Sequence, residues 1–248
     1  MMRLSASKIS LARECLYWLR PEVPFGAESV TKSGPTGKLF HALVAQSMGV
    51  EVEPEDMTGA DEGKAKRMLG AWLRWRADDV PVRWPWVTRW EYEVAYLYDR
   101  VRGIAWRAAS KKEIADRPDH VLAAIVDMLG RDESRTSAVV VDYKTGAKTE
   151  AASVNGQVGL AALALMREPG VPTVREVWGA LAYVKQRKPF DVDIARFTRL
   201  DTADLEDEIR AMVADASSST PRPGDHCWRC RARHFCPAQG NSTPEPTP

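Results

Sequence analysis

Apolar residues recur at helical spacing in three stretches of residues 1–80. The first is capped by Ser5 or Ser7 and ends at Pro21, and the second opens at Pro35 and ends near Gly49. The third has apolar side chains at i, i+3, i+4, i+7 and i+8, namely Ala65, Met68, Leu69, Trp72 and Leu73. The amino-terminal part is therefore predicted to be helical.

The pattern then changes to short runs that are typical of strands. Residues 86–98 and 101–108 predict a β-hairpin, and residues 109–119 predict a charged loop. Two apolar runs rich in β-branched residues follow at 121–129 and 137–144. The polar connection between them can return the chain, so we expect two adjacent antiparallel strands.

The remaining pattern returns to a helix and then alternates again. Residues 153–167 predict a helix, and residues 174–184 and 190–197 predict two further strands. Asp201 or Thr202 can cap a last helix. This order favours an α/β (α+β) fold in which helices flank a mixed β-sheet.

These elements predict one domain over residues 1–239. It consists of a helical part at 1–80, a core at 86–200, and a last helix with a cysteine segment at 201–239. Residues 240–248 are rich in Pro, Thr and Ser and are expected to form a disordered tail.

The most informative motif ends the apolar run at 137–144. Alternation along a strand places Asp142 and Lys144 on the same side, about 7 Å apart. Asp127 lies near the end of the preceding apolar run, so neighbouring strands would present two carboxylates and one ammonium to one point. A divalent-metal phosphodiesterase needs this set, although an acid and a lysine alone are more often a surface ion pair.

Four cysteines form a second candidate site. They are Cys15, Cys227, Cys230 and Cys236, and the last three have the spacing C-x2-C-x5-C. Four thiolates suit a [4Fe-4S] cluster, which would join the first helix to the last segment. Zinc bound by three of these cysteines and His234 is the alternative, and it leaves Cys15 as a core residue. Because only one C-x2-C pair is present, we favour iron–sulfur over zinc.

Composition and charge narrow the class of protein. The 248 residues include 35 Lys and Arg and 34 Asp and Glu, so phosphate binding would depend on local patches. The sequence contains no apolar run near the roughly 20 residues that span a bilayer and no signal-peptide pattern at its start, so we expect a cytoplasmic protein. The sequence also has no phosphate-binding G-x4-G-K-[ST] loop, which excludes a helicase motor within it.

Five features in order resemble the PD-(D/E)XK nuclease superfamily, and most closely its RecB-like branch with an iron–sulfur cluster. That branch includes the CRISPR-associated exonucleases and the AddB nuclease domain. The features span residues 4–237 and are Leu4 to Ile9 with Cys15, Gly37 to His41, Ile125 to Asp127, Val141 to Gly146, and Gln157 with the terminal cysteines.

The chain departs from the family pattern at two points, and one assignment has an alternative. Ala124 stands where the family has glycine before the first acid, and Ala161 stands where tyrosine is expected after Gln157. Asp116 is a second candidate for that first acid. We prefer Asp127, because it ends an apolar run whereas Asp116 lies in a polar stretch.

The resemblance implies a restriction-endonuclease-like fold and metal-dependent hydrolysis of DNA. Mg²⁺ or Mn²⁺ would be bound by His41, Asp127, Asp142 and the backbone carbonyl of Tyr143. Lys144 would orient the attacking water or offset charge on the phosphorus, and Gln157 would position Lys144, the water or the strand. Glu91 and Glu93 in the predicted hairpin are possible further acids of the site, but strand-surface charge is the favoured interpretation.

The resemblance also implies a biological setting. The expected activity is an exonuclease on single-stranded DNA ends, in recombination, repair, phage DNA metabolism or CRISPR-type processing. Recombination or CRISPR proteins are implied partners, and a homo-oligomer is left open. The alternatives are a weakly catalytic DNA-binding accessory subunit and, less favoured, an iron–sulfur electron carrier.

Overall fold

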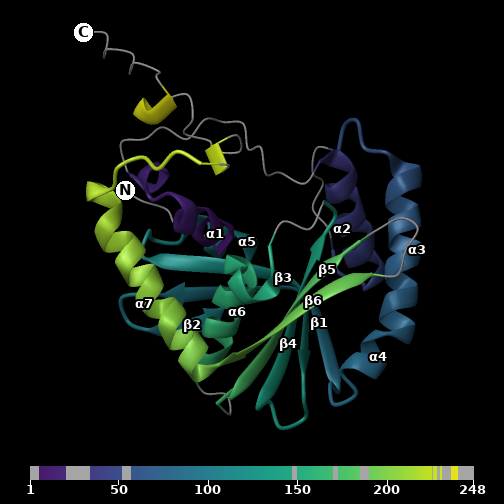
Figure 1. Ribbon diagram of the computed structural model, residues 1–248. Coiled ribbons are helices and arrows are strands. Elements are labelled where there is room, and N and C mark those ends of the chain that lie inside the picture. The colour runs from purple at the N-terminus through teal and green to yellow at the C-terminus, as the bar shows by residue number, and fades with distance from the viewer. Residues whose placement is uncertain are drawn as a thin grey trace.

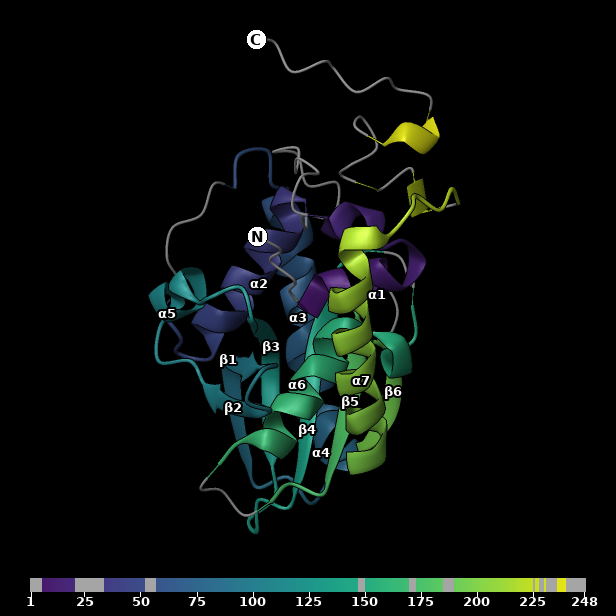
Figure 2. The ribbon, with the colours of Figure 1, turned by 90° about the vertical axis from the view of Figure 1, so that its left-hand side faces the viewer.

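The computed structural model describes residues 6–20, 34–51, 57–146, 150–169, 173–184, 190–224, 226–227, 230 and 236–239. A six-stranded sheet with the order β2-β1-β3-β4-β5-β6 lies at its centre. Helices cover both faces of this sheet: α1, α6 and α7 lie on one side, and α2 and α3 lie on the other (Figures 1 and 2). The sheet flanked by helices that the sequence predicts is confirmed.

The strands lie close to their predicted positions. They are β1 (Arg89–Asp99), β2 (Ile104–Arg107), β3 (Val121–Arg131), β4 (Ser137–Lys144), β5 (Glu176–Tyr183) and β6 (Asp191–Thr198). β4 and β5 are parallel, and the other neighbouring pairs are antiparallel. The sheet is therefore mixed, as expected, because the helix between β4 and β5 carries the chain back to the start of a parallel neighbour.

The described regions contain seven helices, of which the five longer ones follow the predicted periodicity. They are α1 (Ala6–Glu14), α2 (Pro35–Ser47), α3 (Glu62–Asp78), α4 (Val80–Arg83), α5 (Lys111–Asp116), α6 (Gly156–Arg167) and α7 (Arg199–Asp215). Short 3₁₀ turns are η1 (Tyr17–Leu19), η2 (Ala152–Val154), η3 (Ala216–Ser218) and η6 (Pro237–Gln239). None of the helices seen in these regions is long and apolar enough to cross a membrane.

Side-chain caps explain where several helices begin. Asp61 accepts a hydrogen bond of 2.8 Å from the backbone N–H of Lys64 and so starts α3. The Asn155 side chain accepts hydrogen bonds from the N–H groups of Gln157 and Val158, at 3.1 and 3.0 Å, and starts α6. These side chains satisfy N–H groups that the first turn leaves without partners.

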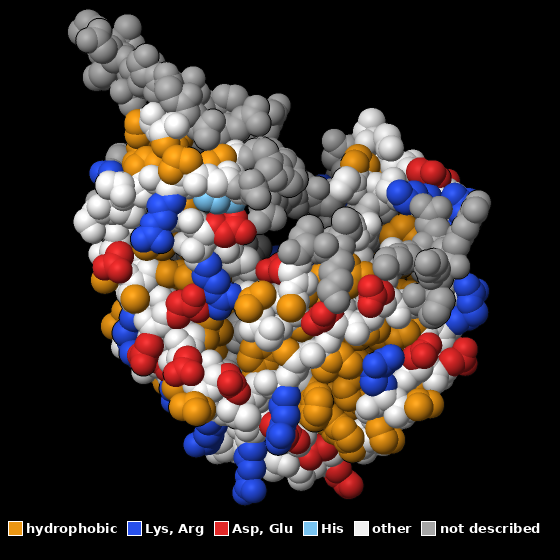
Figure 3. Space-filling view, viewed as in Figure 1, with side chains coloured by type: hydrophobic (Ala, Val, Ile, Leu, Met, Phe, Trp, Pro, Cys, Tyr) orange, Lys and Arg blue, Asp and Glu red, His pale blue; other side chains and the backbone are white. Residues whose placement is uncertain are grey.

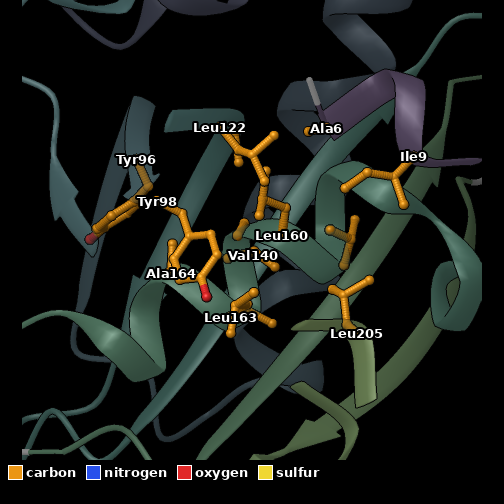
Figure 4. Packing of buried hydrophobic residues seen from close by; sticks show 14 of the residues in the cluster. Ala6, Ile9, Tyr96, Tyr98, Leu122, Val140, Leu160, Leu163, Ala164 and Leu205 are labelled. Carbon is orange, nitrogen blue, oxygen red and sulfur yellow. The ribbon is translucent and has the colours of Figure 1, made fainter. Parts of the chain in front are cut away.

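Each face of the sheet has its own hydrophobic core. Helix α6 is buried along most of its length, and it packs with α1 and α7 against one face (Figure 4). Figure 4 shows Leu160 and Leu163 of α6 beside Val140 of β4 and Leu205 of α7. On the other face, aromatic residues of α2 and α3 surround the buried Tyr143 ring. The two cores fix the sheet between two helical layers.

Local structure differs from the sequence prediction at two places. The expected charged loop at 109–119 contains α5, because Ser110 caps it by accepting from the Glu113 N–H at 3.2 Å. Helix α7 is capped by Thr198 rather than by Asp201 or Thr202, and Asp201 completes a capping box with Thr198. The predicted tail at 240–248 lies outside the described residues.

Candidate metal centre

Asp142 and Lys144 form an ion pair at the end of β4. Asp142 Oδ2 lies 2.5 Å from Lys144 Nζ, on the side that strand alternation predicts. The Asp142 carboxylate is buried, whereas the Lys144 side chain is 31% exposed. Burial raises the pKa of Asp142 to about 6, because the attraction of Lys144 only partly offsets it.

Asp127 connects the neighbouring strand to this pair. Its Oδ2 accepts a hydrogen bond of 2.5 Å from the backbone N–H of Tyr143, the residue between Asp142 and Lys144. Its Oδ1 lies 3.0 Å from Nδ1 of His41. One carboxylate thus holds β3, β4 and α2 in fixed relation.

His41 reaches this carboxylate from helix α2, where Phe40 beside it is fully buried. Burial lowers the pKa of His41, but the charge and hydrogen bond of Asp127 outweigh it, with help from Asp142 and Glu93. The resulting pKa is about 9. The imidazole is therefore held as a cation among three acids at neutral pH.

Three of these side chains could hold a metal ion together. One ligand atom from each of His41, Glu93 and Asp127 lies within 4.8 Å of the others. Two carboxylates and an imidazole suit a divalent cation that accepts both oxygen and nitrogen ligands. Asp142 adds a nearby buried carboxylate, whose Oδ2 lies 2.5 Å from the Lys144 ammonium. The donor set therefore fits a divalent metal.

Of the residues predicted from the sequence, His41, Asp127, Asp142 and Lys144 meet at this point. Asp116 lies exposed in α5 and takes no part in the described metal-ligand group. The Gln157 side chain donates a hydrogen bond to the backbone carbonyl of Ile125, so it contacts β3 two residues before Asp127.

Two residues at the site were not predicted to belong to it. Glu93 was named as a possible further acid but interpreted as strand-surface charge, and it joins the metal-ligand group. Regular alternation along β1 gives no signal for this role, because it does not reveal the positive φ at Glu93. Glu150 lies close enough to Lys144 to help raise the pKa of that amine, together with Asp142 and Asp127 and against the effect of burial.

The iron–sulfur clasp is not supported. In the part of the chain that the structure describes, the four cysteine sulfurs do not form a metal-ligand group of three or more. Cys15 follows the end of α1, and Cys15 and Cys230 are buried in the same apolar core, as small hydrophobic residues are. His234, which the zinc alternative requires, lies outside the described residues.

One part of the clasp prediction agrees with the structure. The cysteine segment does return to the first helix, where His226 Nδ1 lies 3.9 Å from Glu14 Oε2. Cys230 and Cys15 also share a core, as noted above. The cysteine segment and the first helix therefore meet through packing and a contact between His226 and Glu14.

Comparison with known proteins agrees with the geometry of the site. A model of the PD-(D/E)XK nuclease superfamily matches residues 3–237. Among curated proteins, none matches the chain. The mixed six-stranded sheet with helices on both faces is consistent with a restriction-endonuclease-like fold. The chain therefore belongs to the PD-(D/E)XK nuclease superfamily.

Proposed function

We propose that this protein is a Mg²⁺- or Mn²⁺-dependent DNA exonuclease that acts on single-stranded ends. The observation that carries the proposal is the convergence of His41, Asp127, Asp142 and Lys144 from one helix and two adjacent strands. The superfamily supports hydrolysis of phosphodiester bonds in nucleic acid. The exonuclease mode and the preference for single strands rest on the RecB-like motifs of the sequence.

His41, Asp127, Asp142 and the Tyr143 carbonyl are the proposed metal ligands. When bound, a divalent cation supplies polarisation of the phosphate and a lower pKa for the attacking water. An imidazole nitrogen among oxygen ligands favours Mn²⁺ over Mg²⁺. Asp127 arranges this ligand set, because its carboxylate contacts both the Tyr143 N–H and the His41 ring.

Lys144 is proposed to act on the substrate side of the site. Its ammonium is partly exposed and held by buried Asp142, so it can orient a water molecule or offset negative charge at phosphorus. Gln157 is proposed as a positioning residue. The Gln157 side chain donates a hydrogen bond to the Ile125 carbonyl, and this bond would hold β3, and with it Asp127, in position.

Charge on the surface gives little help in choosing the substrate. In Figure 3, basic and acidic side chains are mixed across the face that contains β4 to β6. DNA would therefore be attracted mainly by local clusters of basic side chains, which fits an enzyme that binds strand ends. The alternative, a weakly catalytic accessory subunit of a recombination or CRISPR-adaptation complex, would bind DNA without cutting it.

One experiment separates these two functions. Purified protein is incubated with 5′- or 3′-labelled single- and double-stranded DNA, with Mn²⁺, Mg²⁺ or EDTA. The exonuclease proposal predicts metal-dependent release of short products from single-stranded ends, and the position of the label gives the polarity. DNA binding without cleavage in any of these conditions would support the accessory subunit instead.

The iron–sulfur cluster and RecB-like branch remain predictions from the cysteine spacing and motif order. Iron and sulfide analysis of protein purified without oxygen tests them. Stoichiometric iron in the wild type that is lost in Cys230→Ser would support the cluster. Absence of iron from the wild type would refute it. We further propose a single nuclease domain over residues 1–239 and a cytoplasmic location in DNA recombination or repair.

A further inference from the structure

We propose that Glu93 is a ligand of the catalytic cation, together with His41 and Asp127. The proposal rests on the proposed nuclease function and adds a residue that none of the recognised motifs contains. The three side chains come from β1, α2 and β3, and their ligand atoms lie within 4.8 Å of one another. Glu93 is exposed, so it closes the solvent side of a site whose other acids are less exposed.

Strand β1 changes face at Glu93. Residues two apart normally share one face of a strand. Here Tyr92 packs into the core beneath α2 and α3, whereas Val94 packs into the core beneath α6. The change of face coincides with a φ of +50° at Glu93, which is unfavourable for residues other than glycine.

Strand β3 makes the same change of face directly opposite. Val126 belongs to the α6 core and Met128 to the α2 core, with Asp127 between them. The pairs on either side are Tyr92 with Met128 and Val94 with Val126, so Glu93 and Asp127 face each other across the ladder. Like charges at opposite positions destabilise a sheet, and a bound cation would offset the repulsion between Glu93 and Asp127.

Asp142 is a further acid near these residues. It is 4% exposed, and its Oδ2 lies 2.5 Å from the Lys144 ammonium. Lys144 therefore compensates the charge of Asp142, whereas the group of His41, Glu93 and Asp127 could hold a metal ion.

Glu91 offers a matched control for this proposal. It lies two residues before Glu93 on the same strand, and it pairs with Arg107 instead of the metal-ligand group. The variants Glu93→Gln and Glu91→Gln therefore remove the same charge from the same strand. A third variant, Glu93→Gly, also removes the carboxylate. Because glycine adopts a positive φ without strain, this variant is expected to fold even if Glu93→Gln does not.

The experiment measures Mn²⁺ affinity without DNA, by electron paramagnetic resonance of free Mn²⁺, together with cleavage of labelled DNA. We expect Glu93→Gln and Glu93→Gly to weaken Mn²⁺ binding by about tenfold or more, and Glu91→Gln to change it less than about twofold. Melting in EDTA should show that Glu93→Gly is at least as stable as the wild type.

The possible failures are distinguishable. If Glu93→Gly folds and binds Mn²⁺ as tightly as the wild type, Glu93 is not a ligand, while metal-dependent cleavage by the wild type leaves the proposed function intact. An equal loss of affinity in Glu91→Gln would also overturn the proposal. The loss would then come from the lower negative charge near the site and not from the removal of a ligand. A wild type that neither binds Mn²⁺ nor cleaves DNA would overturn both the ligand and the function.

Discussion

His41 Nδ1 lies 3.0 Å from Asp127 Oδ1, although the two residues are separated by 86 positions in the sequence. This contact joins helix α2 to strand β3 at the point where the acids converge. Without a metal, the protonated imidazole of His41 balances the negative charge of Asp127. A divalent metal would compete with that proton for the same ligands.

Metal affinity should therefore depend on pH. The pKa of His41 is about 9 instead of 6.5, and only the neutral imidazole binds a metal. Mn²⁺ affinity is expected to fall as pH is lowered from about 9, by up to about tenfold per unit for one displaced proton. Mn²⁺ titrations at several pH values check this, and His41→Asn should lose most of the dependence. Equal affinity at pH 7 and pH 9 would contradict it.

The stability of the metal-free protein should have the opposite pH dependence. The folded-state pKa of His41 lies above its unfolded value, so the contribution of the His41–Asp127 pair is complete below about pH 6.5 and is lost as pH rises through about 9. Thermal melting in EDTA should show a loss of stability over this window. His41→Asn should remove that loss, and an identical pH profile in this variant would refute the assignment.

The packing of α1 on α6 depends on Gly156. A Cβ at this position would lie 2.7 Å from the Cβ of Ile9 and would also collide with the Ala6 carbonyl oxygen. Gly156→Ala is expected to lower stability by about 1–3 kcal/mol through overpacking. Gly146→Ala is the control, because nothing lies within 4 Å of its added methyl group. Denaturant unfolding of both variants tests this, and equal effects would show that α1 adjusts without cost.

Gln157 should affect catalysis through the strand that carries Asp127. Its amide binds the Ile125 carbonyl, so Gln157→Ala is expected to lower cleavage by about 10- to 100-fold while the fold remains intact. If the residue acts by positioning Asp127, Mn²⁺ affinity should fall as well. Full cleavage activity with unchanged Mn²⁺ affinity would exclude Gln157 from the site.

The sequence predicts the main elements well because their signals are local. The apolar run that ends in Asp142 and Lys144 defines β4, and Pro35 marks the start of α2. The missed features depend on tertiary geometry. Regular alternation places Tyr92 and Val94 on one face, so it could not reveal the break that turns Glu93 to the site. Cysteine spacing likewise shows which ligands are available, but it does not show whether their sulfurs meet.

The most direct test of the account measures Mn²⁺-dependent DNA cleavage by wild type, Asp142→Asn and Lys144→Ala. Both variants should lose at least about 100-fold in rate, because they remove a metal ligand and the ammonium that acts on the phosphate. Their circular dichroism spectra should match the wild type. Undiminished cleavage by either folded variant would contradict the proposed role of the Asp142–Lys144 pair.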